Sequence, residues 1–178
     1  MAVALIAGQV NKILLDTGVI YLDGNMLSPC EGDNSFVVDV EYRDIPYNGS
    51  AGKTKGLKRI LRENATLTVH PKGLTQSILQ KAIPGYQLDA TGDIIESAGG
   101  RRVILDARYL DEVVLVGDQK DGNTKVITLY RALADNGLSL TLAEDSETIL
   151  ELVFSAHYLQ TDLTDPIYTI EDAAYYGS

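Results

Sequence analysis

The sequence has very few of the residues from which proteins build disulfide frameworks and metal sites. Cys30 is the only cysteine, so no disulfide framework exists and nothing indicates an oxidising compartment. The only histidines, His70 and His157, have no HxxxH or HExxH spacing that would assemble a metal site. We therefore expect each histidine to lie on the face of a strand, and we expect neither a metal nor a cofactor.

A long hydrophobic run is also missing. The apolar start MAVALIAGQV has no basic residue before it and ends after about seven residues, so we expect neither a signal peptide nor a membrane span. No internal repeat or low-complexity segment follows. With 178 residues, 45% of them apolar and 22% charged, the chain has ordinary globular composition, and we expect residues 1–178 to form a single domain.

No group of side chains in the sequence assembles a reaction centre. Cys30 follows a proline in a predicted loop and has no nearby histidine to activate it. The run DQKDGN fails as a calcium loop, because Lys120 stands where an oxygen ligand is needed. Glu144, Asp145 and Glu147 fall in a predicted turn, where solvated acids are common. We therefore expect a protein that is not an enzyme.

The stretch PYNGSAGKTKG is superficially similar to the end of a nucleotide-binding P-loop. The motif needs a glycine five residues before Gly52, but Tyr47 occupies that position. The preceding FVVDVEYRDI alternates apolar and charged residues, and the following sequence soon becomes the β-like ATLTV instead of a long helix. The pattern favours a long polar loop between two strands, Pro46 to Leu57, and NTP binding is a remote alternative.

The net charge of −10 is unevenly distributed along the chain. Five bases and no acid lie between residues 53 and 62, namely Lys53, Lys55, Lys58, Arg59 and Arg62. From Asp111 onward, thirteen acids face only three bases. The basic segment could bind nucleic acid, could contact the acidic surface of another copy of the chain, or could be a solvated loop.

Alternation with a period of two dominates the sequence and predicts antiparallel strands. In ETILELVFSAHYL one face is expected to carry Leu150, Leu152, Phe154, Ala156 and Tyr158. The run VVLV, the turn KDGN and the run TKVITLYRAL read as a β-hairpin. VIYLDG and RRVILDARYL are further strand candidates.

One segment has the pattern of an amphipathic helix. It begins near Thr75, a plausible N-cap, places its apolar residues on one stripe, and ends at Ile83 before a Pro-Gly pair. The sequence thus predicts a mainly β protein: an antiparallel β-sandwich or barrel with one flanking helix at about residues 75–83 and a long inter-strand loop. VVDVEY and ATLTV carry no proline to protect a sheet edge, which suggests edges that pair with other copies.

Several stretches, taken in order, carry a resemblance to a known family. They are LDTGVIYLDG, NSFVVDVEYRDIPYNGSAGKTKGLKRI, NATLTVHPKGLTQSILQKAIPG, NTKVITLYRALADNGLSL and ETILELVFSAHYLQTDLTDPIYTI. This ordered set resembles the major tail tube proteins of long-tailed, siphovirus-type bacteriophages. The resemblance spans nearly the whole chain, although no single motif is diagnostic.

The resemblance implies a β-sandwich that assembles into hexameric rings, which stack into a tube through which the phage genome is delivered. It implies that the loop from Pro46 to Leu57 contacts an adjacent ring. The residues that would serve this contact are Gly49, Gly52, Lys53, Lys55, Gly56 and Lys58. It further implies a place in the virion tail, assembly in the host cytoplasm, and tape-measure, tail-terminator and distal-tail proteins as partners. No membrane is involved.

A conduit for DNA must not bind it, because clustered Lys or Arg would create salt-dependent affinity. Polar members of the alternating strands are therefore candidates for lining the bore, namely Asp39, Glu41, Thr66, Thr68 and Glu151. DNA would pass transiently, without specific binding. We expect residues 165–178 to be mobile or to dock on a neighbour. The inner tube of a contractile or secretion-type injection machine is an alternative with the same architecture.

Overall fold

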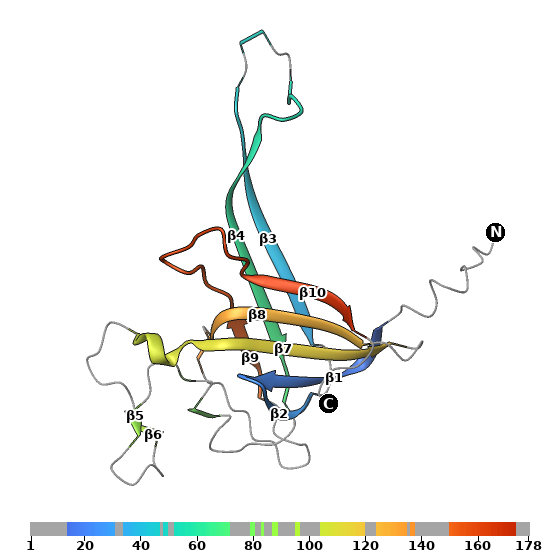
Figure 1. Cartoon of the computed structure of the whole chain (residues 1–178), viewed down its shortest axis with the longest axis vertical. Helices are drawn as coiled ribbons and strands as arrows, with labels where there is room; N and C mark the ends of the chain where they lie inside the picture. Colours follow the sequence, from blue (N-terminus) through green and yellow to red (C-terminus); the bar gives the residue numbers. More distant parts are fainter. Residues whose placement is uncertain are drawn as a thin grey trace, which may run out of the picture.

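The computed structural model describes residues 14–30, 34–46, 48–49, 52–71, 79–80, 83, 87–88, 95–96, 104–119, 124–134, 136–137 and 150–173. These residues confirm the mainly β fold (Figure 1). The strands are β1 (Leu14–Leu22), β2 (Asn25–Cys30), β3 (Ser35–Asp44), β4 (Lys58–Val69), β5 (Gln87–Leu88), β6 (Ile95–Glu96), β7 (Leu110–Gln119), β8 (Thr124–Ala134), β9 (Leu152–Ser155) and β10 (Tyr168–Ala173), with a short 3-10 helix η1 (Asp106–Arg108).

Eight of the strands form two antiparallel sheets that share β8. The first sheet has the order β2-β1-β7-β8-β10, and the second has the order β8-β9-β4-β3. The first part of β8 pairs with β7 and β10, whereas its last residues, Leu133 and Ala134, pair with β9. Strands that pass from one sheet to the other in this way form the corners of sandwiches and barrels. The hairpin predicted from VVLV and TKVITLYRAL is confirmed as β7 and β8.

Arg131 forms a corner in β8 just before the strand passes to the second sheet, since Ala132 still pairs with β7 and Leu133 and Ala134 pair with β9. Its φ of 51° is in the left-handed region, which is unusual for a residue other than glycine. The side chain holds this conformation with three bonds. Nε donates to the His157 carbonyl at 2.8 Å, one terminal nitrogen donates to Asp165 Oδ2 at 2.7 Å, and the other donates to the Pro166 carbonyl at 2.8 Å. The corner therefore ties β8 to the chain that joins β9 to β10.

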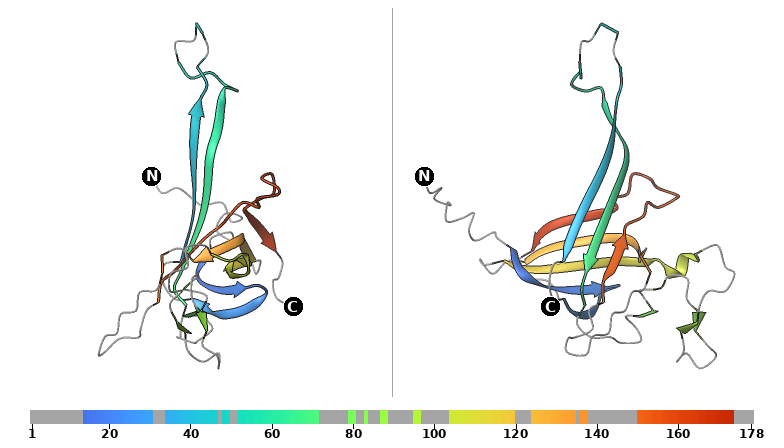
Figure 2. Two further views of the ribbon diagram at one scale, coloured as in Figure 1. Left: turned by 90° about the vertical axis from the view of Figure 1, so that its left-hand side faces the viewer. Right: turned by 180° about the vertical axis from the view of Figure 1, so that it is seen from behind.

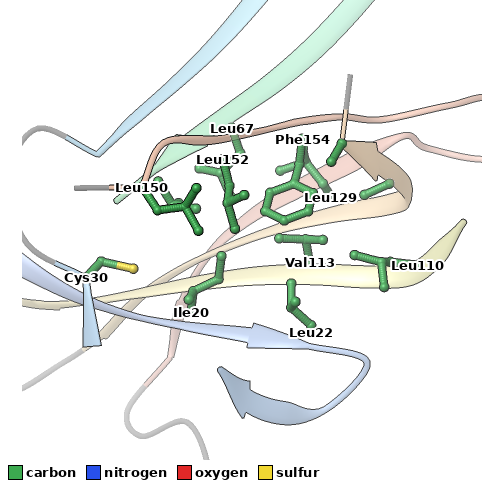
Figure 3. Packing of buried hydrophobic residues seen from close by; sticks show 13 residues of the cluster. Ile20, Leu22, Cys30, Leu67, Leu110, Val113, Leu129, Leu150, Leu152 and Phe154 are labelled. Atoms are coloured by element: carbon green, nitrogen blue, oxygen red, sulfur yellow. The ribbon is translucent and has the colours of Figure 1, made fainter. Parts of the chain in front are cut away.

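The hydrophobic core lies between the two sheets (Figure 3). Ile20, Leu67, Leu129 and Phe154 have no exposed surface, and they come from β1, β4, β8 and β9. Fully burying a side chain of this kind contributes roughly 1.5–3 kcal/mol. The alternation predicted for ETILELVFSAHYL is confirmed from Leu150 to Ala156, which packs against the core although β9 ends at Ser155. Tyr158 differs, with 43% of its surface exposed, because it lies beyond the end of β9.

The turn between β1 and β2 shows how short-range sequence sets the pairing. Asp23 and Gly24 both have positive φ, 48° and 73°, which is the conformation of a two-residue type I′ turn. The Asp23 backbone N–H donates to the Glu112 carbonyl at 3.0 Å, and the Glu112 N–H donates to Asp23 Oδ1 at 3.3 Å. The turn is thereby fastened to the start of β7.

Two segments differ from the sequence prediction. In RRVILDARYL the described part begins as an extended segment and η1, and the strand starts only at Leu110. The C-terminal segment is also not loose over residues 165–173. Asp165 is bonded to Arg131, and β10 pairs with β8 at six successive positions. Backbone pairing with β8 is the physical reason that the chain is held there.

The helix predicted at 75–83 falls largely outside the described residues. Leu79 and Gln80 are helical, and Ile83 packs against the core. The turn at 120–123, residues 138–142 of the run GLSLTL and residues 174–178 lie outside the described part as well.

Replacing Arg131 tests the corner. We expect Arg131→Ala to lower the free energy of unfolding by about 2–4 kcal/mol, because hydrogen bonds from a charged donor are lost and alanine resists positive φ. Arg131→Gly loses the same bonds but tolerates the backbone, so we expect it to be about 1 kcal/mol more stable than the alanine variant. Urea denaturation of the three proteins measures both differences. Equal stabilities of the two variants would contradict the strain at this position.

Candidate assembly surfaces

The β3–β4 hairpin projects far beyond the two sheets (Figure 1, Figure 2). Its inner half belongs to the sandwich, where Ala65, Leu67 and Val69 are buried. We call its outer half, residues 41–62, the arm. All of the arm's described residues are exposed except Ile45 and Leu57, which are partly buried. The change begins at a β-bulge beside Glu41 and Tyr42, where the register between the strands shifts. Bulges bend and twist a hairpin, which fits the point at which it leaves the body.

The predicted polar loop is the tip of this arm. Gly49 and Gly56 have φ of 92° and 89°, so the two positions need glycine. The Ile45 N–H donates to the Leu57 carbonyl at 2.8 Å and closes the loop. Lys53 lies 3.6 Å from Asp44, with 81% and 44% of the two side chains exposed, so this ion pair adds little stability.

The arm tip lacks the geometry of a P-loop. Thr54 is followed by a turn at residues 55–56 and then by β4, all within the described residues. No helix starts there, so the backbone N–H groups and the dipole that would hold a phosphate are missing from this segment. Gly52, Lys53 and Thr54 instead contribute to a small hollow of about 270 Å³. Its lining residues are Asp44, Ile45, Pro46, Gly52, Lys53, Thr54 and Leu57.

The arm combines exposed apolar side chains with positive charge. Tyr42, Ile60 and Leu61 expose 51%, 59% and 56% of their surface. The arm also carries Arg43 directly opposite Arg59 in the ladder, which is an unfavourable pairing of like charges in an isolated hairpin. Lys58 Nζ lies 4.0 Å from the centre of the Tyr42 ring. Large apolar side chains surrounded by charge are typical of a protein–protein contact.

The five lumen candidates lie on one face of the second sheet. The ladder places Val37 opposite Thr66, Asp39 opposite Asn64, and Glu41 opposite Arg62. Thr66 and Thr68 stand opposite Ser155 and Val153 of β9, and Glu151 is two residues before Val153. Because strand side chains alternate, this face is opposite the one that carries Leu67 and Phe154 into the core. It is mainly polar, apart from Val37 with 55% of its surface exposed, and it holds Asp39, Glu41 and Glu151 against one arginine, Arg62.

The histidines and the cysteine occupy structural positions. The His70 backbone N–H donates to Asn34 Oδ1 at 3.1 Å, and His70 Nε2 lies 3.6 Å from Glu151 Oε2 on the polar face. His157 lies beyond the end of β9, in the corner, with Nδ1 3.2 Å from the Arg131 carbonyl. Burial raises the pKa of the Cys30 thiol to about 11. The cysteine is thus protonated at neutral pH and unsuited to act as a nucleophile.

Neither a metal site nor a membrane helix is found in the described part of the chain. No group of three or more His, Cys, Asp or Glu residues there could hold a metal ion. None of the helices in that part is long and apolar enough to cross a membrane.

This chain shares its fold with a solved tube-terminating cap. The cryo-EM structure of the anti-feeding prophage cap, a tube-terminating cap, matches 97% of this chain and 95% of its own length, with a TM-score of 0.52 and 12% identity. A crystal structure of an Hcp protein matches 89% of this chain and 99% of its own, at 12% identity and a TM-score of 0.37. No protein-family model and no curated protein matches the sequence.

Neither the corner at Arg131 nor the exposure of the arm's apolar residues was predicted from the sequence. A charged residue inside the apolar run LYRALA is the available signal for Arg131, because strict alternation breaks there and Ala132, Leu133 and Ala134 are all buried. Tyr42, Ile60 and Leu61 fit the strand pattern, so nothing in the pattern distinguishes them from core residues.

Thiol labelling tests the position of Cys30. Because burial raises the pKa of the Cys30 thiol from its ordinary value of 9.0 to about 11, the thiolate is about a hundredfold scarcer in the native protein than in the unfolded chain at pH 8. We expect labelling by an aromatic disulfide reagent to be at least that much slower in the native protein than in urea. The raised pKa also means that stability is fully present below pH 9 and falls as pH rises toward 11. Equal labelling rates would show that Cys30 is accessible.

Proposed function

We propose that this protein is a structural subunit that assembles with copies of itself into stacked hexameric rings, forming the tail tube of a long-tailed bacteriophage. The arm is the observation that carries the proposal. It extends an ordered, basic and partly apolar surface well beyond the body, where only another molecule can cover it. A projecting element that meets a different surface on the next copy makes a head-to-tail contact, which closes into rings or continues as a filament.

The sheet edges support lateral contact within a ring. Within the described residues β3 pairs only with β4, and β10 pairs only with β8. The outward sides of these strands carry backbone N–H and C=O groups that a strand from another copy could pair with. On β10, Ile170 exposes 51% of its surface, which adds an apolar contact to such a pairing.

Charge supports contact between copies as well. The arm holds a cluster of lysines and arginines, whereas the rest of the chain carries most of its acids, for a net charge of −10. Electrostatic complementarity between copies speeds encounter and fixes orientation. Opposed acids would also relieve the repulsion between Arg43 and Arg59.

The polar face of the second sheet is the proposed lining of the bore. Three acids against one arginine give this face a net negative charge, so DNA passing along it would be repelled rather than bound. The protein would then deliver the genome from the virion tail without being an enzyme. Tape-measure, tail-terminator and distal-tail proteins are its proposed further partners, and assembly would take place in the host cytoplasm.

A second candidate is a tube or cap component of a contractile or secretion-type injection machine. It is favoured by the fold shared with the tube-terminating cap of the anti-feeding prophage. The two candidates differ in their behaviour, because a cap ends a tube whereas a tube subunit continues it. Indefinite polymerisation of the purified chain supports the tube subunit, and addition only to preformed tube ends supports the cap.

The arm's charge tests self-assembly. Purified wild-type protein, concentrated and imaged by negative-stain electron microscopy, is expected to form rings or filaments of uniform bore. Lys53→Glu with Lys55→Glu should raise the concentration needed for assembly at least about tenfold, equal to 1.4 kcal/mol per contact. Lys53→Arg with Lys55→Arg keeps the charge and should assemble like the wild type. Assembly of the glutamate variant at wild-type concentration, with an unchanged thermal transition, would contradict a role for the arm.

Charge reversal on the polar face tests the bore. Tubes carrying Asp39→Lys, Glu41→Lys and Glu151→Lys are expected to retain DNA at low salt, to protect it from nuclease, and to release it as salt rises. The control reverses Asp106 and Asp111, which are exposed outside this face and outside the β3 and β10 edges. DNA bound by the control should remain open to nuclease. Equal protection in both proteins would show that the polar face is not the bore.

A further inference from the structure

The loop between β9 and β10, residues 156–167, presents an exposed apolar side chain on a rigid support. Leu163 exposes 69% of its surface, the largest value among the large hydrophobic residues of the described part. The loop is fixed at its base by Arg131, which bonds to His157, Asp165 and Pro166. Contact with a partner would bury this leucine at little cost in conformational entropy, because the loop that carries it is already ordered.

The outer turn of this loop is fixed by its own bonds. The Asp162 N–H donates to the Leu159 carbonyl at 3.2 Å, and Asp162 Oδ1 accepts from the Thr164 N–H at 2.9 Å and from the Thr164 hydroxyl at 2.6 Å. These bonds from Thr164 also hold the pKa of the Asp162 carboxyl below its usual value, so the group is charged at neutral pH. The turn therefore displays Leu163 next to a permanent negative charge.

The hollow at the arm tip has matching properties. Ile45, Pro46 and Leu57 give it apolar walls. Its charged lining residues are Lys53 and Asp44, which lie 3.6 Å apart, and Lys53 is the more exposed of the two, so its ammonium group remains accessible to a second acid. Its volume of about 270 Å³ lies below the roughly 300–1,000 Å³ of ordinary small-molecule sites. A hollow of this size suits one aliphatic side chain better than a metabolite.

We propose that Leu163 of one copy inserts into the arm-tip hollow of the next copy, with Asp162 of the first facing Lys53 of the second. This inference rests on the proposed self-assembly and names the surface that receives the arm. The arm tip and the β9–β10 loop of the same copy are well separated in every view, so the contact joins different copies (Figure 1, Figure 2). Because the two surfaces differ, the contact is head-to-tail and can repeat indefinitely.

A disulfide between copies tests the contact. In the full chain we replace Thr54, an exposed lining residue of the hollow, and Leu163 by cysteine. Mild oxidation of assembled Thr54→Cys/Leu163→Cys protein is expected to give a ladder of covalent dimers, trimers and longer species on a denaturing gel. Cys30 is buried and does not interfere. The control is Thr54→Cys with Met26→Cys. Met26 is also exposed, at 56%, but it lies in β2 and not in the β9–β10 loop, so the control should give no ladder.

Mixing two variants gives an independent readout. Leu163→Asp removes the inserting side chain, and Leu57→Asp removes an apolar wall of the hollow, so neither variant alone should stack beyond single rings. Mixed, rings of one variant supply the surface that rings of the other lack, and growth stops after one contact. The expected product in sedimentation velocity is a stack of two rings, with twice the mass of the ring that either variant forms alone. Assembly of the wild type without the 54–163 ladder, or continued polymerisation of either variant, would overturn this contact and leave the proposed function intact. A wild-type chain that never assembles would overturn both.

Discussion

The fold depends on one corner. Among the described strands only β8 is shared by the two sheets, and Arg131 within it has a backbone conformation that arginine adopts only at a cost. The guanidinium of Arg131 offsets that cost with three bonds to the chain between β9 and β10. The same bonds hold the chain just before β10 and fix the base of the loop that displays Leu163. An interaction that closes the sandwich thus also shapes a surface proposed for contact with another copy.

The β3–β4 hairpin follows a second constraint, since one ladder serves two environments. Its inner half buries Leu67 and Val69 at roughly 1.5–3 kcal/mol each, which is enough to hold a long hairpin whose outer half contributes little. Its outer half exposes Tyr42, Ile60 and Leu61 and opposes Arg43 to Arg59. Such features are unfavourable in an isolated chain, and they persist because the buried half stabilises the whole hairpin. Core packing therefore does not constrain which residues stand in the outer half, and they can suit the surface of a partner.

The strand pairing and the polar face were predictable from the sequence, but only where the alternation of apolar and polar residues reflects burial in the core. Period-two patterns predicted the β7–β8 hairpin and placed Asp39, Thr66 and Glu151 together on one polar face. The same pattern does not reveal that Tyr42 and Ile60 are exposed, because a strand that projects beyond its sheet can keep alternating although nothing packs on its apolar face. It failed again at β10, where pairing with β8 over six residues, and not hydrophobicity, holds the chain. Arg131 could not be predicted as a corner, because its role comes from partners about 26 to 35 residues away.

In the proposed tube, the distribution of charge would connect assembly with passage of DNA. A conduit must present no accessible cluster of lysine and arginine, yet the arm carries Lys53, Lys55, Lys58 and Arg59 within seven residues. Left uncovered, this arm would attract the DNA that the polar face is proposed to repel, with an affinity that rises as salt falls. Burying it against acids of a neighbouring copy removes that attraction. Arg62, the base on the polar face, is already placed opposite Glu41. The contacts that form the tube would then also allow DNA to leave it, because joining the copies would neutralise their basic surface.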